Sequence, residues 1–367
     1  MALTPNSSSG NEYKQLSSIF KAHFQGDLHL SRIRLIALFI SALCKVKSVN
    51  YSALAAGFDS RATSASCFRR IQRFMAESDL TMEMVAKVIF KLLPVKGKVT
   101  LVMDRTNWQL GKKNINILML GVSYKNVAFP LIFEMLDKKG NSNTAERIAL
   151  VERFIKWFGK DCIDCLLADR EFIGEQWLDF LNHNQIRYHI RIRNNFKITP
   201  GGSQKEIKAY YLFNKLLINQ IYHHPKIVRM HGVECYLSGM KTRCEGKVDF
   251  VIIVSFNRPQ EALNYYSERW QIETLFRALK TSGFNLENTH VTHLDRLEKL
   301  TMLTMLAFTW CYLVGDFIDR EIKPITIKKH GRRAVSVFRC GLDYISKILI
   351  TGINQLNICI VHFLSCT

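Results

Sequence analysis

Two short apolar segments of this chain each end directly on an aspartate. Residues 99–103 are followed by Asp104, and residues 165–168 are followed by Asp169. Short apolar runs rich in branched side chains are typical of strands buried in a sheet. Each acid alone has an ordinary explanation, because an aspartate can terminate a strand, cap a helix or pair with a neighbouring arginine.

The sequence around these two segments predicts an α/β domain. Residues 115–124 and 128–136 predict two further strands, and Asn143 with Glu146 has the pattern of a helix capping box. A second helix is expected at about residues 174–182. The order of three strands, a helix, a strand and a helix is typical of a mixed sheet covered by helices.

Residues 186–193 alternate between polar and apolar side chains, which predicts a half-buried strand. The alternation assigns four side chains to one face, which we expect to be exposed and basic: Arg187, His189, Arg191 and Arg193. Residues 194–247 are polar and rich in turns, so we interpret them as an insertion. Residues 248–256 predict another buried strand.

Residues 265–281 predict an amphipathic helix. Its apolar side is interrupted by Glu268. The other side carries five residues within an arc of roughly 80°, namely Tyr266, Arg269, Glu273, Arg277 and Lys280. A carboxylate beside a phenol and three cations suits a site where a metal ion and a phosphate meet. The alternative is a solvated helix face with Arg and Glu at i, i+4 spacing.

The formal net charge of +20 predicts a polyanionic partner, with nucleic acid the first candidate and an acidic membrane surface the second. Residues 187–247 contain twelve Lys or Arg against three acids, and residues 1–98 contain fourteen against six. We therefore expect these two regions to make most of the contacts with the polyanion.

Residues 1–98 also predict helices at 30–45 and 51–58, and a third helix that Ser64 can cap. The second and third helices are separated by a tight turn, and the third is basic (Arg69, Arg70 and Arg73). This arrangement resembles a helix-turn-helix, although many helical hairpins share it. We expect the hairpin to bind DNA.

Ten cysteines occur at irregular spacing, and the only CxxC motif is formed by Cys162 and Cys165. We interpret all ten as reduced thiols of a cytoplasmic protein, and this pair as small apolar residues in preference to a redox or metal site. The longest uncharged apolar run, residues 300–315, is shorter than the roughly 20 residues that span a bilayer. We expect a buried helix there, and no membrane partner.

The spacing Tyr266-x2-Arg269-x3-Glu273-x6-Lys280 resembles the signature of the bacterial DDE transposases of the insertion sequence four family. Residues 169–171 (Asp-Arg-Glu) resemble the second-aspartate motif of that family, and residues 103–106 (Met-Asp-Arg-Thr) stand where its first aspartate occurs. The long gap before Glu273 is similar to the β-rich insertion of the family. The resemblance covers roughly residues 98–340.

The resemblance implies a domain organisation. It implies a ribonuclease-H-like catalytic domain at residues 98–299, with a β-rich insertion at about 194–247. An N-terminal helical DNA-binding domain would occupy residues 1–97. A helical C-terminal region would occupy residues 300–367 and could serve dimerisation.

The resemblance also implies an activity, namely cut-and-paste transposition by hydrolysis at the element ends and transfer of the 3′-OH into target DNA. Asp104, Asp169 and Glu273 would hold two Mg²⁺ ions, for which Mn²⁺ can substitute. The implied DNA contacts are Tyr266, Arg269, Lys280, Arg277, Arg191 and Arg193. The implied partners are the terminal inverted repeats, the target DNA and a second copy in a synaptic homodimer, within the bacterial cytoplasm and near the nucleoid.

Two alternatives remain open. A non-catalytic DNA-binding protein or inhibitor derived from a transposase would bind DNA without Mg²⁺-dependent cutting. A ribonuclease-H-like nuclease would cut DNA without joining strands. The sequence departs from the related enzymes in one respect, because they often use a Trp of the insertion to stack on a flipped base and none occurs between Trp177 and Trp270. The aromatic candidates are Tyr210, Tyr211, Phe213 and Tyr222.

Overall fold

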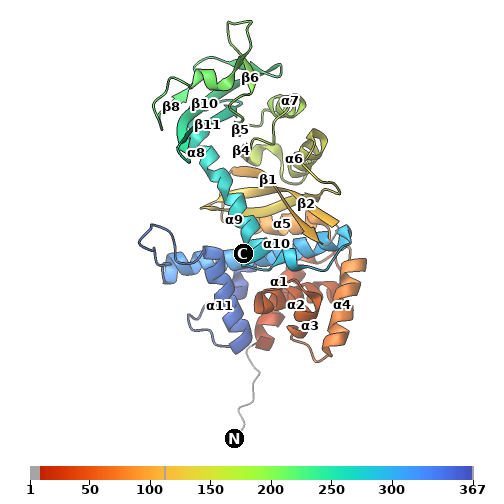
Figure 1. Cartoon of the computed structure of the whole chain (residues 1–367). Helices are drawn as coiled ribbons and strands as arrows, with labels where there is room; N and C mark the ends of the chain where they lie inside the picture. The colour runs from red at the N-terminus through yellow and green to blue at the C-terminus, as the bar shows by residue number, and fades with distance from the viewer. Residues whose placement is uncertain (1–8, 111–112, 366–367) are drawn as a thin grey trace. The chain divides into compact units, whose positions relative to one another are not determined.

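The computed structural model describes residues 9–110 and 113–365 of the chain (Figure 1). The chain forms two compact units. The helical unit contains Met1–Pro94, Trp108–Asn114 and Phe276–Thr367, and the sheet unit contains Val95–Asn107 and Ile115–Leu275. The N-terminal and C-terminal regions that the sequence suggested as separate parts therefore belong to one unit.

Five strands confirm the predicted order at the start of the sheet. They are β1 (Val99–Leu110), β2 (Lys113–Tyr124), β3 (Val127–Met135), β4 (Ile163–Ala168) and β5 (Tyr188–Ile192). They lie side by side in the order β3-β2-β1-β4-β5. β1 is parallel to β4 and β4 is parallel to β5, whereas β2 and β3 are antiparallel. The mixed α/β class is confirmed.

Two helices follow the first strands, as predicted. α6 (Thr144–Phe158) begins with a complete capping box, in which the Asn143 side chain accepts from the Glu146 N–H and the Glu146 side chain accepts from the Asn143 N–H. α7 (Glu175–His183) packs beside α6 (Figure 1). Their buried apolar residues, such as Phe154 and Trp177, contribute to the core of the sheet unit.

The insertion is rich in strands, as expected, and it continues the same sheet. It contains β6 (Lys197–Pro200), β7 (Ile207–Lys208), β8 (Ile221–His223), β9 (Val228–Met230) and β10 (Val233–Cys244). β11 (Lys247–Ser255) lies antiparallel to both β5 and β10, so it connects the insertion to the first five strands. The sheet therefore continues in the order β5-β11-β10-β9-β6-β7, with β8 beside β10.

The expected basic face of residues 187–193 is wrong at two of its four positions. Arg187 is buried between Asp164 and Glu261, with nitrogen to oxygen distances of 2.5 and 2.6 Å. His189 is fully buried, and its Nδ1 lies 2.8 Å from the Ser255 hydroxyl oxygen. Burial lowers the pKa of His189 to about 4, so the ring is neutral at pH 7. The alternation could not show that β5 is covered by α8 (Ala262–Ser267).

The segment predicted as one amphipathic helix is helical but irregular. It consists of η3 (Pro259–Glu261), α8, η4 (Glu268–Trp270), α9 (Gln271–Arg277) and the π-helical turn η5 (Ala278–Ser282). The division between the two units falls inside α9, after Leu275. The five residues expected on one face are therefore divided between the units. Tyr266, Arg269 and Glu273 belong to the sheet unit, and Arg277 and Lys280 belong to the helical unit.

The helical unit is built from both ends of the chain. Its long helices are α1 (Ser9–Phe24), α2 (Leu30–Val46), α4 (Ser64–Glu77), α5 (Met82–Leu92), α10 (Leu294–Phe317) and α11 (Val337–Thr351). α2 packs against both α10 and α11, which explains why residues 300–367 do not form a part of their own. Shorter helices are α3 (Tyr51–Ala56), η6 (Leu286–Asn288), η7 (Ile318–Ile322) and η8 (Ile360–Leu364).

The predicted helical hairpin is present as α3 and α4, which pack against each other. The cap of α4 differs from the prediction, because the Thr63 hydroxyl accepts from the Ser66 N–H and Ser64 is the first helical residue. Arg69 and Arg73 are exposed on α4. Ile71 and Phe74 are buried on its opposite side.

α10 is the core helix of the helical unit. With η7, it is long and apolar enough to cross a membrane by length and composition, which the shorter uncharged run did not reveal, but 89% of its most apolar window is buried in the protein. This agrees with the expected buried helix. α10 approaches α11 closely at Gly315 and Gly341, where an added Cβ would lie 2.0 Å from the Val337 carbonyl oxygen and 1.8 Å from that of Cys311.

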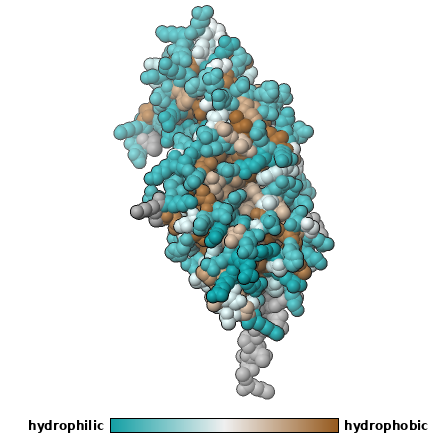
Figure 2. Space-filling view, turned by 90° about the vertical axis from the view of Figure 1, so that its right-hand side faces the viewer, coloured by the Kyte–Doolittle hydropathy of each residue, from teal (hydrophilic) through white to brown (hydrophobic). Residues whose placement is uncertain are grey.

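The surface is largely polar on one face, and the described cysteines are not paired in disulfides. Hydrophilic side chains cover most of the face shown in Figure 2, with apolar ones between them in small groups. The eight cysteines whose side chains are described are free thiols. Cys165 is buried in β4, as a small apolar residue would be, and Cys162 is half-buried before that strand.

Candidate active site

The sheet brings Asp104 and Asp169 to the same level of two neighbouring strands. β1 and β4 are parallel, and Met103 of β1 is paired with Ala168 of β4. The residue that follows each of them is an aspartate, so Asp104 and Asp169 lie at the same level of neighbouring strands. The pairing of Met103 with Ala168 accounts for this proximity, although only β4 ends there: β1 continues to Leu110, so Asp104 lies within its strand and not at its end as the sequence predicted.

Two residues of the late helical segment connect these aspartates with Glu273. The Tyr266 hydroxyl donates to Asp169 Oδ1 at 3.0 Å. Arg269 Nη1 donates to Asp104 Oδ2 at 3.2 Å, and its Nη2 donates to Glu273 Oε1 at 2.8 Å. One guanidinium therefore separates Asp104 from Glu273. The three acids predicted from the sequence thus contact two neighbouring residues of one helical segment.

Arg269 is buried, which excludes the solvated helix face as an explanation of its pairing with Glu273. Its side chain is 3% exposed, and its Nε has no hydrogen-bond partner among the described residues. The guanidinium carbon lies 4.5 Å from the centre of the Trp270 ring and 5.8 Å from that of Tyr266. Such contacts with aromatic faces stabilise a cation that is removed from water.

Glu268 also has a structural explanation, although it interrupts the apolar side of the predicted helix. The Ser123 hydroxyl of β2 lies 2.5 Å from Glu268 Oε2 and 2.9 Å from Gln271 Oε1. Gln271 also accepts from the backbone N–H of Tyr124. These bonds fix the helical segment to β2 one residue before Arg269 and two residues after it.

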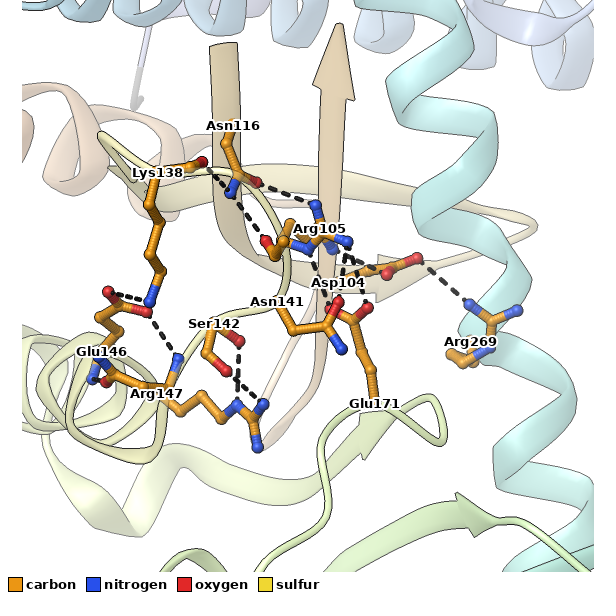
Figure 3. A network of polar contacts seen from close by, with 12 residues as sticks. Asp104, Arg105, Asn116, Lys138, Asn141, Ser142, Glu146, Arg147, Glu171 and Arg269 are labelled. Atoms are coloured by element: carbon orange, nitrogen blue, oxygen red, sulfur yellow. Dashed lines mark hydrogen bonds and ion pairs between the residues drawn. The ribbon is translucent and has the colours of Figure 1, made fainter. Parts of the chain in front are cut away.

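A polar network beside Asp104 was not predicted from the sequence (Figure 3). The backbone N–H of Arg105 donates to Asp104 Oδ1 at 2.7 Å, and its guanidinium Nε donates to Glu171 Oε1 at 3.3 Å. The same guanidinium donates to the side-chain oxygens of Asn116 and Asn141. Arg105, which follows Asp104, therefore binds Glu171, which is two residues after Asp169. The Asp-Arg-Glu motif at residues 169–171 includes Glu171, but the motif does not indicate that Arg105, which is distant in sequence, is its partner.

The environment of Asp104 disfavours its charged form. Burial raises the pKa of Asp104 to about 6, and the negative charges of Glu171 and Asp169 add to the rise. The backbone N–H of Arg105 and the charge of Arg269 oppose it. The positive charge around this carboxylate is therefore too small to compensate for its removal from water.

The donor chemistry of this cluster fits a hard divalent cation. Asp104, Asp169, Glu273 and the nearby Glu171 offer only oxygen atoms, which Mg²⁺ and Mn²⁺ prefer. The desolvated Asp104 would gain from an added cation. Among the described residues, no three His, Cys, Asp or Glu side chains converge as a formed metal site. In this structure Arg269 and Tyr266 occupy carboxylate oxygens that a cation would need.

Of the other predicted contact residues, Arg191 and Arg193 belong to the sheet unit, and Arg277 and Lys280 belong to the helical unit. Arg191 is half-buried on β5, with Nη2 3.6 Å from Asp249 Oδ2, and Arg193 is exposed after the same strand. In the helical unit, Arg277 is exposed, and Lys280 Nζ lies 2.7 Å from Glu287 Oε1 and 5.6 Å from the centre of the Trp108 ring.

The four aromatic candidates in the insertion differ in exposure, and two of them, Tyr210 and Tyr222, are half-buried. Phe213 is fully buried, so it cannot stack on a base. Tyr211 is 51% exposed, and its ring centre lies 4.4 Å from that of Tyr210. An exposed ring at Tyr211 therefore remains the most accessible of these candidates.

We expect the stability of the metal-free protein to fall as the pH rises from about 4 to about 6. Asp104 has a folded pKa of about 6 against an ordinary 3.8, so the folded protein binds this proton more tightly than the unfolded chain does. The resulting decrease in the free energy of unfolding is absent below the pKa of Asp104 in the unfolded chain. It is complete above the pKa in the folded protein, where it amounts to about 3 kcal/mol.

Asp104→Asn should remove this part of the decline, because the amide keeps an oxygen for Arg269 and carries no charge. The measurement is the Tm of both proteins across this pH range in a chelator. A variant that followed the wild-type curve would show that another group causes the decline.

Comparison with known proteins identifies a family for this chain. Residues 96–310 match the family described as the transposase DDE domain, a range that is more than half of the chain and includes all three acids. No curated protein matches the chain. A cryo-EM structure of the piggyBac transposase synaptic complex with hairpin DNA has a TM-score of 0.43 and 11% sequence identity, covering 96% of this chain and 73% of that chain.

Proposed function

Because the chain belongs to the transposase DDE domain family, we propose that it is a cut-and-paste DNA transposase of an insertion sequence. It would cleave DNA at the ends of the element and transfer the 3′-OH into target DNA. The finer assignment to the insertion sequence four family rests on the Tyr266, Arg269, Glu273 and Lys280 spacing.

One observation supports this proposal above the others. Tyr266 and Arg269 bind all three acids, at 2.8 to 3.2 Å, although the acids come from three distant parts of the sequence. An ordinary strand end or a surface ion pair does not require this convergence. Carboxylates grouped in this way can hold the metal ions that assist phosphoryl transfer.

Asp104, Asp169 and Glu273 would hold two Mg²⁺ ions. Such ions activate the attacking oxygen and stabilise the leaving oxygen of a phosphodiester. Tyr266 and Arg269 are hydrogen-bond donors, since burial raises the pKa of the Tyr266 phenol and keeps it protonated. They can therefore bind phosphate oxygens when the carboxylates bind cations. Trp270 and Tyr266 would keep the Arg269 guanidinium oriented for this exchange.

The proposed domain roles follow the same assignment. The strand order β3-β2-β1-β4-β5, with one acid after β4 and another in β1, supports a ribonuclease-H-like catalytic domain. The hairpin of α3 and α4 would bind the terminal repeats, and the basic residues Arg191 and Arg193 would follow the DNA backbone. Two copies would act together on two element ends, in the bacterial cytoplasm near the nucleoid.

The test is incubation of the protein with Mg²⁺ and DNA that carries the repeats flanking its own gene. We expect nicks at the element ends on a denaturing gel, followed by joining of the released 3′ ends to a target plasmid. Cutting without joining would identify a nuclease. Binding without Mg²⁺-dependent cutting would identify a non-catalytic transposase derivative.

We also expect DNA binding to weaken steeply with salt. If six phosphates are contacted, the affinity should fall by roughly a thousandfold between about 50 mM and 200 mM salt. Fluorescence anisotropy with a labelled duplex at several salt concentrations gives the slope. A nearly flat dependence would contradict a role of the +20 net charge in binding DNA.

A further inference from the structure

The helical unit contains a cavity beside the hairpin of α3 and α4. Its volume is about 280 Å³. Three segments line it, namely residues 49–52, residues Phe68 and Gln72 of α4, and residues 289–293 together with Arg296 of α10. These segments are far apart in the sequence but all belong to the helical unit. The cavity therefore lies where the N-terminal hairpin meets the start of α10.

Two residues that line this cavity carry polar groups without a hydrogen-bond partner among the described residues. The Tyr51 hydroxyl is buried and has no hydrogen-bond partner among the described residues. Burial raises the pKa of Tyr51, so this hydroxyl remains a donor. The Arg296 guanidinium forms no hydrogen bond or ion pair within the described part of the chain. A buried hydroxyl without a partner is costly, so a partner supplied by a ligand would explain why it is kept there.

The start of α10 adds further donors to the same cavity. His293 is its N-cap residue and makes no side-chain capping hydrogen bond. The first backbone N–H groups of a helix have no partner inside the helix, and they attract anions. Asp295, the acidic residue of the first turn, is exposed and does not line the cavity, but its negative charge acts on the Tyr51 phenol and opposes the effect of Arg296 there. An anion in the cavity would thus meet Arg296 and the positive end of a 24-residue helix.

The other walls are aromatic and apolar. The Tyr51 and Phe68 rings meet edge to face, with centres 6.4 Å apart, and Val49 and Val291 lie beside them. An inorganic anion alone would leave these walls without a complementary surface. A nucleotide unit combines a phosphate with an apolar sugar and a planar base, and so matches both kinds of wall.

We propose that this cavity binds one nucleotide unit of a DNA strand held by the neighbouring hairpin. Arg296 and the N-terminus of α10 would bind its phosphate. The Tyr51 hydroxyl, which water cannot reach in this structure, would turn toward the cavity and donate to a phosphate or sugar oxygen. Arg69 and Arg73 are exposed on α4, in the residues next to Phe68 and Gln72, and would bind adjoining phosphates. This inference rests on the proposed function, because it assumes that the hairpin binds DNA.

Tyr51→Phe is the decisive variant because it removes only the hydroxyl. If the hydroxyl serves DNA, the variant should keep or raise the Tm, since it deletes an unsatisfied buried group. Its affinity for a labelled DNA duplex, measured by anisotropy, should nevertheless fall by about tenfold, as expected for the loss of a hydrogen bond to a charged group. A purely structural hydroxyl would give the opposite pair of results, with a lower Tm and unchanged affinity.

Arg296→Gln is the second variant, and Lys21→Gln on α1 is its matched control. Lys21 is exposed in the same unit and does not line the cavity, so its substitution changes the net charge equally. We expect the Arg296 variant to lose about tenfold in affinity and the control to lose clearly less. If Arg296→Gln lowers the Tm strongly, its loss of affinity can be explained by unfolding. The affinity of Tyr51→Phe for the duplex then tests the proposal.

The outcomes separate this inference from the proposed function. Variants at Tyr51 and Arg296 that bind the duplex as tightly as the control would overturn the cavity proposal, while DNA cleavage by the wild type would keep the proposed function. A wild type that neither binds nor cleaves DNA would overturn both. Thermal stabilisation of the wild type, but not of Tyr51→Phe, by free thymidine monophosphate without any change in duplex affinity would assign the cavity to a free nucleotide instead.

Discussion

Asp104→Ala, Asp169→Ala and Glu273→Ala should each lower Mg²⁺-dependent DNA cleavage by about a thousandfold or more. Each variant removes oxygen ligands from the place where the proposed cations stabilise developing charge. DNA affinity should stay nearly unchanged, because most of it comes from basic residues outside this cluster. Cleavage of labelled element ends on a denaturing gel and anisotropy with the same DNA measure the two effects separately.

Asp179→Ala provides the matched control for these substitutions. Asp179 is exposed on α7 of the same unit and makes no contact with the three acids. This variant should cleave at the wild-type rate. Equal losses of cleavage and binding in the three acid variants would refute the assignment, because they would indicate a general loss of structure.

The local pattern predicted much of the sheet unit. Apolar runs and turn residues gave the strands β1 to β5 and the helices between them, and one capping box gave the start of α6. The end of a strand located Asp169, which follows β4, but not Asp104, because β1 continues to Leu110 and the two acids are neighbours through strand pairing. These features are encoded within about ten residues of sequence, where periodicity is informative.

Contacts between distant residues could not be predicted in this way. The alternation of residues 187–193 could not show that Arg187 is bound by Glu261 and Tyr265, which are 74 and 78 residues away in the sequence. Helical spacing correctly grouped Arg269 with Glu273, but it did not reveal that the guanidinium is buried. The Arg105 to Glu171 pair has a separation of 66 residues, and no local pattern specifies such a partner.

The division into units shows the same limit. Residues 300–315 were correctly expected to form a buried helix, but their apolar character does not identify what covers them. The structure shows that α2 from the N-terminal region and α11 from the C-terminal region do so. Composition can predict that a helix is buried, whereas its neighbours depend on the shape of the whole unit.

Arg269→Gln should destabilise the metal-free protein by about 3 kcal/mol, and divalent cations should recover much of that loss. The substitution removes a side chain that is 3% exposed and leaves the buried Asp104 carboxylate without its cation. Mg²⁺ or Mn²⁺ can replace the lost charge at the same oxygens, since a ligand that binds only the folded state stabilises it. We therefore expect the Tm of this variant to rise more with Mn²⁺ than the Tm of the wild type.

Arg187→Gln is the matched control for this prediction. Arg187 is similarly buried, at 8% exposure, and it also bridges two acids, Asp164 and Glu261. Its loss should destabilise the protein to a similar extent. Recovery by Mn²⁺ should be small, because the two remaining carboxylates are each about a third exposed and water already compensates for much of their charge. Equal recovery in both variants would mean that unpaired carboxylates, and not a metal site at Asp104 and Glu273, explain the effect of the cation.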